Sequence, residues 1–413
     1  MAIVRPFCAV RPNPVVVSQV AALPYDVFDR KEACQVVKGK PLSFLNIDRP
    51  ETQFSEDVDI YADCVYEKAR ELLEARMTDG TFIQDEDPCY YVYQLTMDGR
   101  SQTGIVACSA VDDYVDQVIK KHENTREEKE MDRIRHVDTT NAQTGPIFLA
   151  YRAVEELDRL VGQVCAGKPV YSFTAQDGVE HKVWKIAAPG LLEQIEKAFR
   201  KVPVTYIADG HHRAASAVKV GLKRRKEHPN YTGEEPFNYF LSVLFSDEQL
   251  MIMPYNRVVK DLNGLSKEEF LDKVSQSFVV KEEGRYPYAP DEKGQIGMYL
   301  EGQWYSLKAR AEILSEDPVK GLDVSLLQDA LLGPVLGITD PRTDARIDHI
   351  GGIRGLKELE RRVDEDMKVA FSMYPTSIQE LFAVADAGLL MPPKSTWFEP
   401  KLRSGIFIHK LGE

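Results

Sequence analysis

Residues 204–217 read VTYIADGHHRAASA, and this stretch predicts a short strand that turns directly into a helix. The strand is expected over residues 204–208, the turn at Asp209-Gly210, and the helix through the alanines that follow Arg213. Such a turn gathers unpaired backbone N–H groups and the positive end of the helix dipole at one point, which favours an anion. His211, His212 and Arg213 add side-chain donors there. The stretch therefore predicts a phosphate site, although an N-cap aspartate beside two exposed histidines is the simpler interpretation.

Length, composition and charge limit the class of protein. The chain has 413 residues, 43% hydrophobic and 28% charged, so it can bury a sizeable core and divide into two or three domains. A formal net charge of −13 argues against nucleic acid as a partner, because duplex binding depends on clustered Lys and Arg. Prolines and arginines interrupt the N-terminal stretch, so we expect a cytoplasmic protein without a signal peptide or membrane span. The six scattered cysteines indicate reduced thiols.

Hydrophobic periodicity indicates an α+β protein. Three hairpins are expected at Asp98-Gly99, Asp177-Gly178 and Glu301-Gly302. Helices are expected between them, over residues 58–77, 153–165, 191–201, 213–226, 267–278 and 356–369. Because strands and helices interleave irregularly, the pattern favours α+β over a regular βαβ series. We expect three parts: an α+β domain over residues 1–253, a small helix-plus-hairpin subdomain over 254–320, and a C-terminal α/β segment over 321–413 that packs back on the core.

Two loops upstream of residues 204–217 carry polar residues that suit chemistry. In the first, Asp26 lies on a proline-led turn, where a carboxylate can accept a proton; alternatively it caps the helix expected near Arg30. The second follows a strand that ends near Ile119, and its candidate ligand-binding residues are Lys121, His122, Glu123 and Thr125. The alternative for this second loop is a polar segment that caps the next helix.

Two further groups are candidates for anion binding. If residues 126–138 are helical, Lys129, Arg133 and His136 share one face, and we take Arg135 and His136 from this segment as candidate ligands. Near the C-terminus, Lys394 and Ser395, together with Lys401, could close over an anionic ligand; a basic surface loop is the alternative.

Several common phosphate and hydrolase motifs are missing from the sequence. Gly39-Lys40 and Gly167-Lys168 are each followed by proline, so neither forms a P-loop. The chain has no G-x-S-x-G or H-E-x-x-H motif, and the glycines of residues 351–355 have the wrong spacing for a dinucleotide fingerprint. The phosphate site predicted at residues 209–213 is therefore of another type.

The sequence of residues 209–213 resembles the Asp-Gly-His-His-Arg box of the free serine kinases (SerK), which belong to the ParB/sulfiredoxin-like superfamily. The chain also resembles a SerK-like, ParB-related family of unknown function in Arg11-Pro12 and in residues 24–27, 121–125 and 391–401. The resemblance implies a ParB/sulfiredoxin-like core with additional α+β subdomains.

The resemblance also implies an activity. A kinase of this kind transfers a phosphoryl group from ATP, ADP or pyrophosphate, with Mg²⁺, to free L-serine or a related hydroxyl compound. Gly210, His211, His212 and Arg213 would then bind phosphate, Asp209 would orient the acceptor or the Mg²⁺ ion, and Asp26 would be the base. The implied partners are thus the small-molecule substrate serine and a phosphoryl donor.

Two other classes of protein stay open at this point. One is a ParB-like nucleotide-binding regulatory module, which the acidic charge and the lack of a helix-turn-helix disfavour. The other is a metal-dependent hydrolase with His122, His136, His211 and His212 as ligands.

Overall fold

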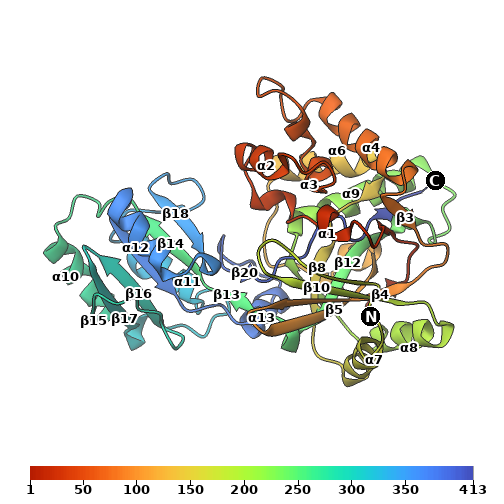
Figure 1. The fold of residues 1–413 in the computed structure, drawn as a ribbon. Helices are drawn as coiled ribbons and strands as arrows, with labels where there is room; N and C mark the ends of the chain where they lie inside the picture. Colours follow the sequence, from red (N-terminus) through yellow and green to blue (C-terminus); the bar gives the residue numbers. More distant parts are fainter. Residues whose placement is uncertain (413) are drawn as a thin grey trace. The chain divides into compact units, whose positions relative to one another are not determined.

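The computed structural model describes residues 1–412, and the chain divides into two compact units (Figure 1). The first unit comprises Met1–Leu250 and the described residues from Pro400 onward. The second unit is Met251–Glu399. Each unit contains its own sheet and its own apolar core, as expected for a mixed α+β fold.

A nine-stranded sheet forms the centre of the first unit. Its strands are β1 (Val4–Arg5), β4 (Tyr90–Met97), β5 (Arg100–Ala110), β6 (Ile119–Lys120), β8 (Ile147–Tyr151), β9 (Tyr171–Thr174), β10 (Glu180–Ile186), β11 (Thr205–Asp209) and β12 (Tyr239–Ser246). They lie in the order β6-β11-β8-β12-β5-β4-β10-β9, and β1 pairs with β5. Two neighbouring pairs, β6 with β11 and β8 with β12, are parallel, and the others are antiparallel.

Helices cover both faces of this sheet (Figure 1). One layer contains α4 (Asp63–Thr78), α6 (Glu127–Thr140) and α9 (His211–Glu227), and the other contains α7 (Glu155–Cys165) and α8 (Pro189–Phe199). The alanines of α9 allow close packing, because Ala214 and Ala217 are buried in the same core cluster as the strands. Smaller elements complete the unit: β2 (Val10–Pro12), α1 (Val17–Val20), η1 (Tyr25–Val27), α2 (Arg30–Val37), α3 (Leu45–Asp48), β3 (Phe82–Gln84), α5 (Val111–Val115), β7 (Ala142–Gln143) and β21 (His409–Lys410).

Strand β12 shows how the sequence produces this core. It lies between β5 and β8, and its side chains from Phe240 onward are buried, so its run is apolar on both faces rather than alternating. The exceptions are Ser246, at the end of the strand, and Ser242, whose buried hydroxyl forms a 2.8 Å hydrogen bond with that of Ser109. The Ser242 hydroxyl is therefore satisfied inside the core.

A six-stranded sheet forms the second unit. Its strands are β14 (Tyr255–Val259), β15 (Phe278–Gly284), β16 (Gln295–Leu300), β17 (Gln303–Ala309), β18 (Ile347–Gly351) and β19 (Val369–Met373), in the order β15-β17-β16-β19-β14-β18. The α-helices and remaining strands of this unit are β13 (Ile252–Met253), α10 (Lys267–Ser277), α11 (Asp323–Leu327), α12 (Leu356–Glu365), α13 (Ile378–Asp386) and β20 (Trp397–Phe398).

The expected three-part division differs from this arrangement. Strand β19, from the expected C-terminal segment, lies between β16 and β14 of the expected small subdomain. Residues 254–320 and 321–399 therefore share one sheet, and the chain from Pro400 onward belongs to the first unit. Pairing between strands that are distant in sequence decides this division. Local hydrophobic periodicity does not indicate which distant strands will pair.

The three expected hairpins form as β4–β5, β9–β10 and β16–β17. At the first turn Asp98 and Gly99 have φ of 51° and 78°, and at the third Glu301 and Gly302 have φ of 49° and 77°. These positive values are those that a two-residue hairpin turn requires. The helix expected over residues 58–77 begins later, at Asp63, because residues 58–62 form turns.

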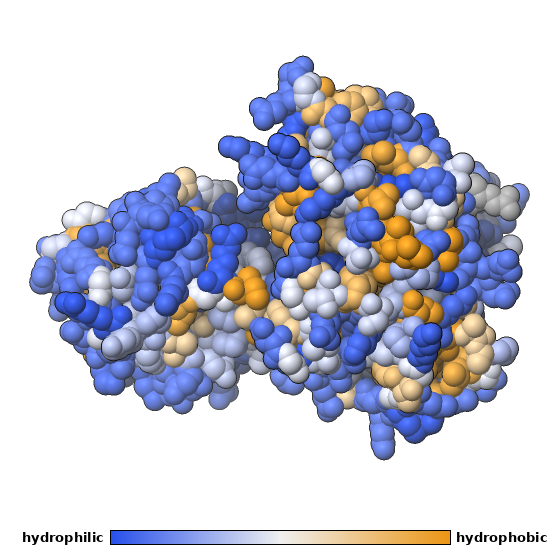
Figure 2. Space-filling view, viewed as in Figure 1, coloured by the Kyte–Doolittle hydropathy of each residue, from blue (hydrophilic) through white to orange (hydrophobic). Residues whose placement is uncertain are grey.

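Hydrophilic residues cover most of the second unit on the face shown in Figure 2, whereas the first unit exposes several separate apolar groups there. Within residues 1–412, no helix combines the length and the apolar composition that crossing a bilayer would need.

A buried ion pair attaches the N-terminal segment to the first sheet. Arg11 Nε and Nη2 donate to the two carboxylate oxygens of Asp85 at 2.7 and 2.9 Å, and Lys185 Nζ donates to Asp85 Oδ1 at 2.8 Å. The Tyr91 hydroxyl also donates to Asp85. The side chains of Arg11 and Asp85 are only 10% and 6% exposed, so these hydrogen bonds replace solvent around both charges.

We expect Asp85→Ala to lower the free energy of unfolding by about 3–5 kcal/mol, because it leaves Arg11 buried without its carboxylate. The matched control is Asp340→Ala, which removes the exposed partner of Arg342 and should cost less than about 1 kcal/mol. Calorimetric unfolding of both variants measures the difference. Equal effects for the two would contradict a stabilising role for the buried pair.

The same pair predicts a pH dependence. Burial alone would raise the pKa of Asp85, but the hydrogen bonds from Arg11, Lys185 and Tyr91 outweigh burial and lower it to about 2. Because the folded-state pKa is depressed, the stabilisation is present above the unfolded value of about 3.9 and is lost as pH falls towards 2. The stability difference between the wild type and Asp85→Ala should therefore shrink between about pH 4 and pH 2. A difference that stays constant over this range would contradict the assignment.

Candidate phosphate-binding site

The parallel pairing of β6 and β11 brings two distant segments together. Ile119 pairs with Thr205 and Lys120 with Tyr206. Parallel strands end at the same edge of a sheet, and here each strand is followed by a loop and then a helix. The loop of residues 121–125, which leads into α6, therefore lies beside residues 209–213, which begin α9.

The turn after β11 has an open helix N-terminus. Gly210 is the N-cap residue of α9, with φ of 92°, and no side chain caps the helix. The first hydrogen bond of the helix runs from Ala214 N–H to the Gly210 carbonyl at 2.9 Å. The backbone N–H groups of the first turn thus have no acceptor within the helix, and they point out of its positive end.

Two cations converge on Asp209 at this turn. Arg213 Nη2 lies 3.0 Å from Asp209 Oδ2, and Lys401 Nζ lies 3.4 Å from Oδ1. Burial would raise the pKa of Asp209, but Lys401 and Arg213 outweigh it and lower the pKa to about 2. The carboxylate is therefore charged at neutral pH, and it holds both cations beside the helix N-terminus.

Gly210 is required for this arrangement in two ways. Its φ is in the left-handed region, and a Cβ atom there would come within 3.0–3.1 Å of the Arg213 guanidinium. Arg213 thus folds back over the turn, and its Nη1 also donates to the Pro146 carbonyl at 2.6 Å.

The loop of residues 121–125 places His122 against His211. The two rings meet edge to face with centroids 4.5 Å apart, and both residues are buried. Glu123 Oε2 lies 3.9 Å from His211 Nδ1. Burial lowers the pKa of His122 to about 4 and lowers that of His211 well below its ordinary value, so both imidazoles are neutral at pH 7. Of the other candidates in this loop, Thr125 donates to Glu130 at 2.7 Å and Lys121 is exposed.

His212 connects helix α9 to helix α6 through a hydrogen bond. Its Nε2 accepts a hydrogen bond from the backbone N–H of Arg126, the N-cap residue of α6, at 3.0 Å. The imidazole therefore satisfies one of the donors that the start of α6 leaves unpaired. Burial is the main cause that lowers the pKa of His212, which keeps this acceptor nitrogen unprotonated.

Asp26 lies close to residues 209–213 and does not cap α2. The cap is Asp29, whose side chain accepts from Glu32 N–H at 2.8 Å in a capping box. Asp26 is exposed on η1 and is near enough to His212 and Arg213 to influence the pKa of each. Its carboxylate is thus available at the same site.

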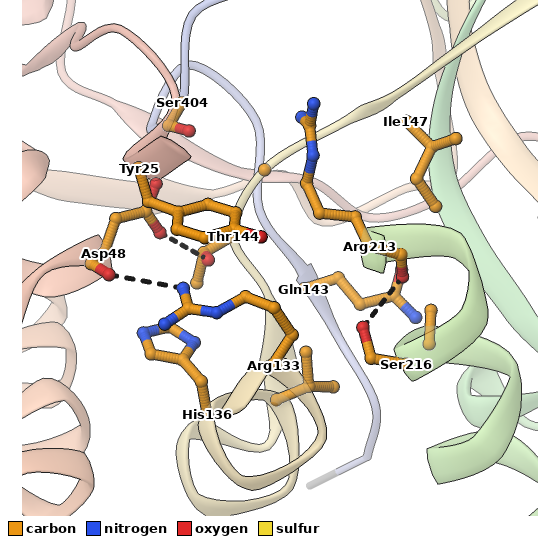
Figure 3. Close-up of a pocket in the computed structure, with 13 residues that line it drawn as sticks. Tyr25, Asp48, Arg133, His136, Gln143, Thr144, Ile147, Arg213, Ser216 and Ser404 are labelled. Carbon is orange, nitrogen blue, oxygen red and sulfur yellow. Dashed lines mark hydrogen bonds between the residues drawn. The ribbon is translucent and has the colours of Figure 1, made fainter. Parts of the chain in front are cut away.

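A narrow polar pocket lies behind the turn (Figure 3). Figure 3 shows Tyr25 and Asp48 across the pocket from Arg213 and Ser216 of α9. Arg133 stacks on the Tyr25 ring, 4.1 Å from its centroid, and donates to the Asp48 carbonyl at 3.2 Å. The cavity of about 30 Å³ has room for about one water molecule, so a nucleotide does not fit within it.

Two candidates from helix α6 take different positions. His136 lines the pocket, where its Nε2 lies 2.9 Å from the Ile47 carbonyl. Arg135 faces α4 instead: it donates to the Tyr61 carbonyl at 2.6 Å, pairs with Asp63 and stacks on Tyr66. The pocket contains Arg133 in its place, because residues two apart on a helix point in different directions.

The candidate residues near the C-terminus are divided between the two units. Lys394 and Ser395 belong to the second unit. There Lys394 Nζ lies 5.5 Å from the centroid of Tyr255, and the Ser395 hydroxyl donates to the Pro392 carbonyl at 2.6 Å. Lys401 belongs to the first unit and is the residue that reaches Asp209.

Several pocket residues, among them Asp48, Thr144 and Ser404, have no counterpart among the sequence-based candidates. Thr144 Oγ1 donates to Asp48 Oδ1 at 2.8 Å, and Ser404 lies against Gly145, where a Cβ atom would meet the Ser404 hydroxyl at 3.3 Å. For Thr144 the sequence offers one signal, the adjacent dipeptide Gly145-Pro146, which is typical of a turn or loop.

The histidine ligand set considered for a hydrolase does not assemble. The Nε2 atom of His136 is hydrogen-bonded to Ile47 and that of His212 to Arg126, and only His122 and His211 meet. A four-histidine metal centre is therefore not formed.

Fold and site together define a mixed α+β protein with a cationic strand-to-helix turn. The chain belongs to the DUF1015 family, described as a protein of unknown function, whose model matches residues 4–325. No curated protein matches the chain.

Several solved structures are similar to this chain. One is a free serine kinase in complex with AMP, at 15% identity and a TM-score of 0.35, which covers 74% of this chain and 91% of the kinase. Another is SbnI with a C-terminal truncation from Staphylococcus aureus, at 12% identity and a TM-score of 0.37, covering 71% and 82% of the two chains. A third is a conserved hypothetical protein from Pyrococcus furiosus, at 15% identity and a TM-score of 0.33, covering 74% and 94%.

The geometry of the turn predicts the effect of a Cβ atom at Gly210. Gly210→Ala should destabilise the protein more than Gly99→Ala, because both positions have positive φ but only Gly210 also contacts Arg213. The strain common to both is about 1–2 kcal/mol. Calorimetry of the two variants isolates the contact with Arg213. Indistinguishable unfolding midpoints would show that the guanidinium does not lie over the turn.

Proposed function

We propose that this protein is a small-molecule kinase that transfers a phosphoryl group to the hydroxyl of free L-serine or a related compound. The observation that supports the proposal most is the convergence of Arg213, Lys401 and the open N-terminus of α9 beside the exposed carboxylate of Asp26.

The donor phosphates bind at the turn. Phosphoryl transfer depends mainly on positioning and on positive charge around the transferred group. The backbone N–H groups of residues 211–213 supply fixed dipoles, and Arg213 and Lys401 supply charge. Asp209 orients these two cations before the donor arrives, so little reorganisation is needed during the reaction. His212 keeps α9 and α6 in register, and Lys121, His122, Glu123 and Thr125 line the adjacent loop.

Asp26 is the base in this proposal. The acceptor hydroxyl oxygen forms a new bond to phosphorus while the bond between phosphorus and the leaving oxygen of the donor breaks. The hydroxyl proton passes to the Asp26 carboxylate, and the donor leaves one phosphate shorter. The identity of the acceptor, and a ParB/sulfiredoxin-like core, rest on the resemblance of residues 209–213 to the box of the free serine kinases.

The protein's own residues do not fit Mg²⁺. This ion requires oxygen ligands, usually several waters with one or two carboxylates and the substrate phosphates. Both oxygens of Asp209 are already engaged by cations, and Glu123 is grouped with the imidazoles of His122 and His211 rather than with other oxygen ligands. Mg²⁺ would supply charge neutralisation on the donor phosphates, but no dedicated protein site holds it.

Phosphoserine formation tests the proposal. The full chain is incubated with L-serine, Mg²⁺ and either ATP, ADP or pyrophosphate, and the product is measured by mass spectrometry. We expect O-phosphoserine with at least one of the three donors. The incubation that yields product identifies the donor that the protein uses. Arg213→Ala should lower kcat/KM by about 10²–10³-fold, the usual effect of removing one preorganised donor.

The matched control is Arg224→Ala, which removes an arginine from the other end of the same helix, where it pairs with Asp138. This variant should retain wild-type activity. If no donor yields phosphoserine above the level of Arg213→Ala, serine kinase activity is excluded. If Arg213→Ala and Arg224→Ala are equally active, the turn does not bind the transferred phosphate.

A further inference from the structure

A cluster of three potential metal ligands lies beside the turn. His122 and Glu123 come from the loop after β6, and His211 is the first residue of α9. Each side chain offers one ligand atom, and the three atoms lie within 4.8 Å of one another. Among residues 1–412, no other group of three or more His, Cys, Asp and Glu side chains has this geometry.

The two imidazoles carry nitrogens that the protein leaves unsatisfied. His122 Nδ1 and His211 Nε2 are buried and have no hydrogen-bond partner. A buried polar atom without a partner costs about 1–3 kcal/mol, so each such atom in a native protein calls for an explanation, and a bound water or ion is one. His122 is 2% exposed and His211 is 6% exposed. Because both side chains are buried, bulk water has little access to the two unpaired ring nitrogens.

The protein also orients the cluster. The other ring nitrogen of His122 donates to the backbone carbonyl of Ile207 in β11, which fixes the ring and directs the unpaired Nδ1 away from that strand. A hydrogen bond from the second nitrogen to a backbone carbonyl is the usual way in which a ligating histidine is held. Glu123 closes the cluster from the solvent side, with its side chain 44% exposed.

We propose that His122, Glu123 and His211 bind one divalent transition metal ion, with Zn²⁺ as the preferred metal. Two imidazoles and a carboxylate suit Zn²⁺ or a neighbouring first-row metal and do not suit Mg²⁺. Three protein ligands leave a further position open for water or substrate, as in zinc sites that act on a substrate. The ion would lie next to the backbone N–H groups of the turn. His211 would then contribute its imidazole to the metal and only its backbone N–H to a phosphate.

Metal binding by the full chain, without nucleotide or serine, tests this site separately from kinase activity. The untagged protein is stripped with a chelator, exposed to Zn²⁺, Co²⁺ or Mg²⁺, desalted, and analysed for bound metal. We expect one Zn²⁺ or one Co²⁺ per chain and no retained Mg²⁺. The visible absorption of the Co²⁺ form reports nitrogen and oxygen ligands independently of the metal count.

Variants locate the ion. His122→Gln and His211→Gln should abolish stoichiometric binding, and Glu123→Gln should raise the Kd for Zn²⁺ by about 10–100-fold or more. The matched control is His409→Gln, which changes another buried histidine, bonded to the Pro236 carbonyl, and should keep one Zn²⁺ per chain. Because Glu123 is partly exposed, its variant remains informative if a histidine variant fails to fold.

Two outcomes overturn the site: a wild-type chain that retains less than one Zn²⁺ or Co²⁺, or a Glu123→Gln variant that binds Zn²⁺ as tightly as the wild type. Zinc held only by thiols such as the exposed Cys64 would give the second result, because it would not respond to Glu123. A positive metal result without phosphoserine formation would leave the metal site intact and exclude the kinase.

Discussion

The parallel pairing of β6 with β11 is the constraint on which the candidate site depends. Antiparallel strands would send the two following segments to opposite edges of the sheet, whereas these strands end together. The pairing therefore sets the loop of residues 121–125 beside the N-terminus of α9. It also explains why α6 and α9, which follow the two strands, pack against each other and share the hydrogen bond between His212 and Arg126.

One carboxylate partly offsets the positive charge at the turn. Arg213 and Lys401 would repel each other beside a helix N-terminus that is already positive, and Asp209 offsets this repulsion. The same carboxylate fixes the positions of both cations, so the site is ordered without a ligand. In the proposed function a phosphate would meet donors that are already oriented, which is the property that distinguishes a catalytic electrostatic site from a flexible basic surface.

The sequence predicted local features of this protein well. The turn at Asp209-Gly210 and the hairpins at Asp98-Gly99 and Glu301-Gly302 form as expected, because glycine and its neighbour determine backbone conformation within a few residues. Features that depend on distant contacts were not predictable in the same way. Helical spacing groups Arg133 with His136, and both line the pocket, but it does not say which face of the helix the pocket lies against. The insertion of β19 between β16 and β14 does not follow from spacing along the chain, because it is decided by which strands pair.

The proposed function requires that the first turn of α9 binds the phosphates of a donor. Crystals of the protein soaked with pyrophosphate test it most directly, through difference density at the turn. We expect phosphate oxygens within hydrogen-bond distance of the backbone N–H groups of residues 211–213 and of the Arg213 and Lys401 side chains. Pyrophosphate bound elsewhere on the protein, with no density at the turn, would contradict it.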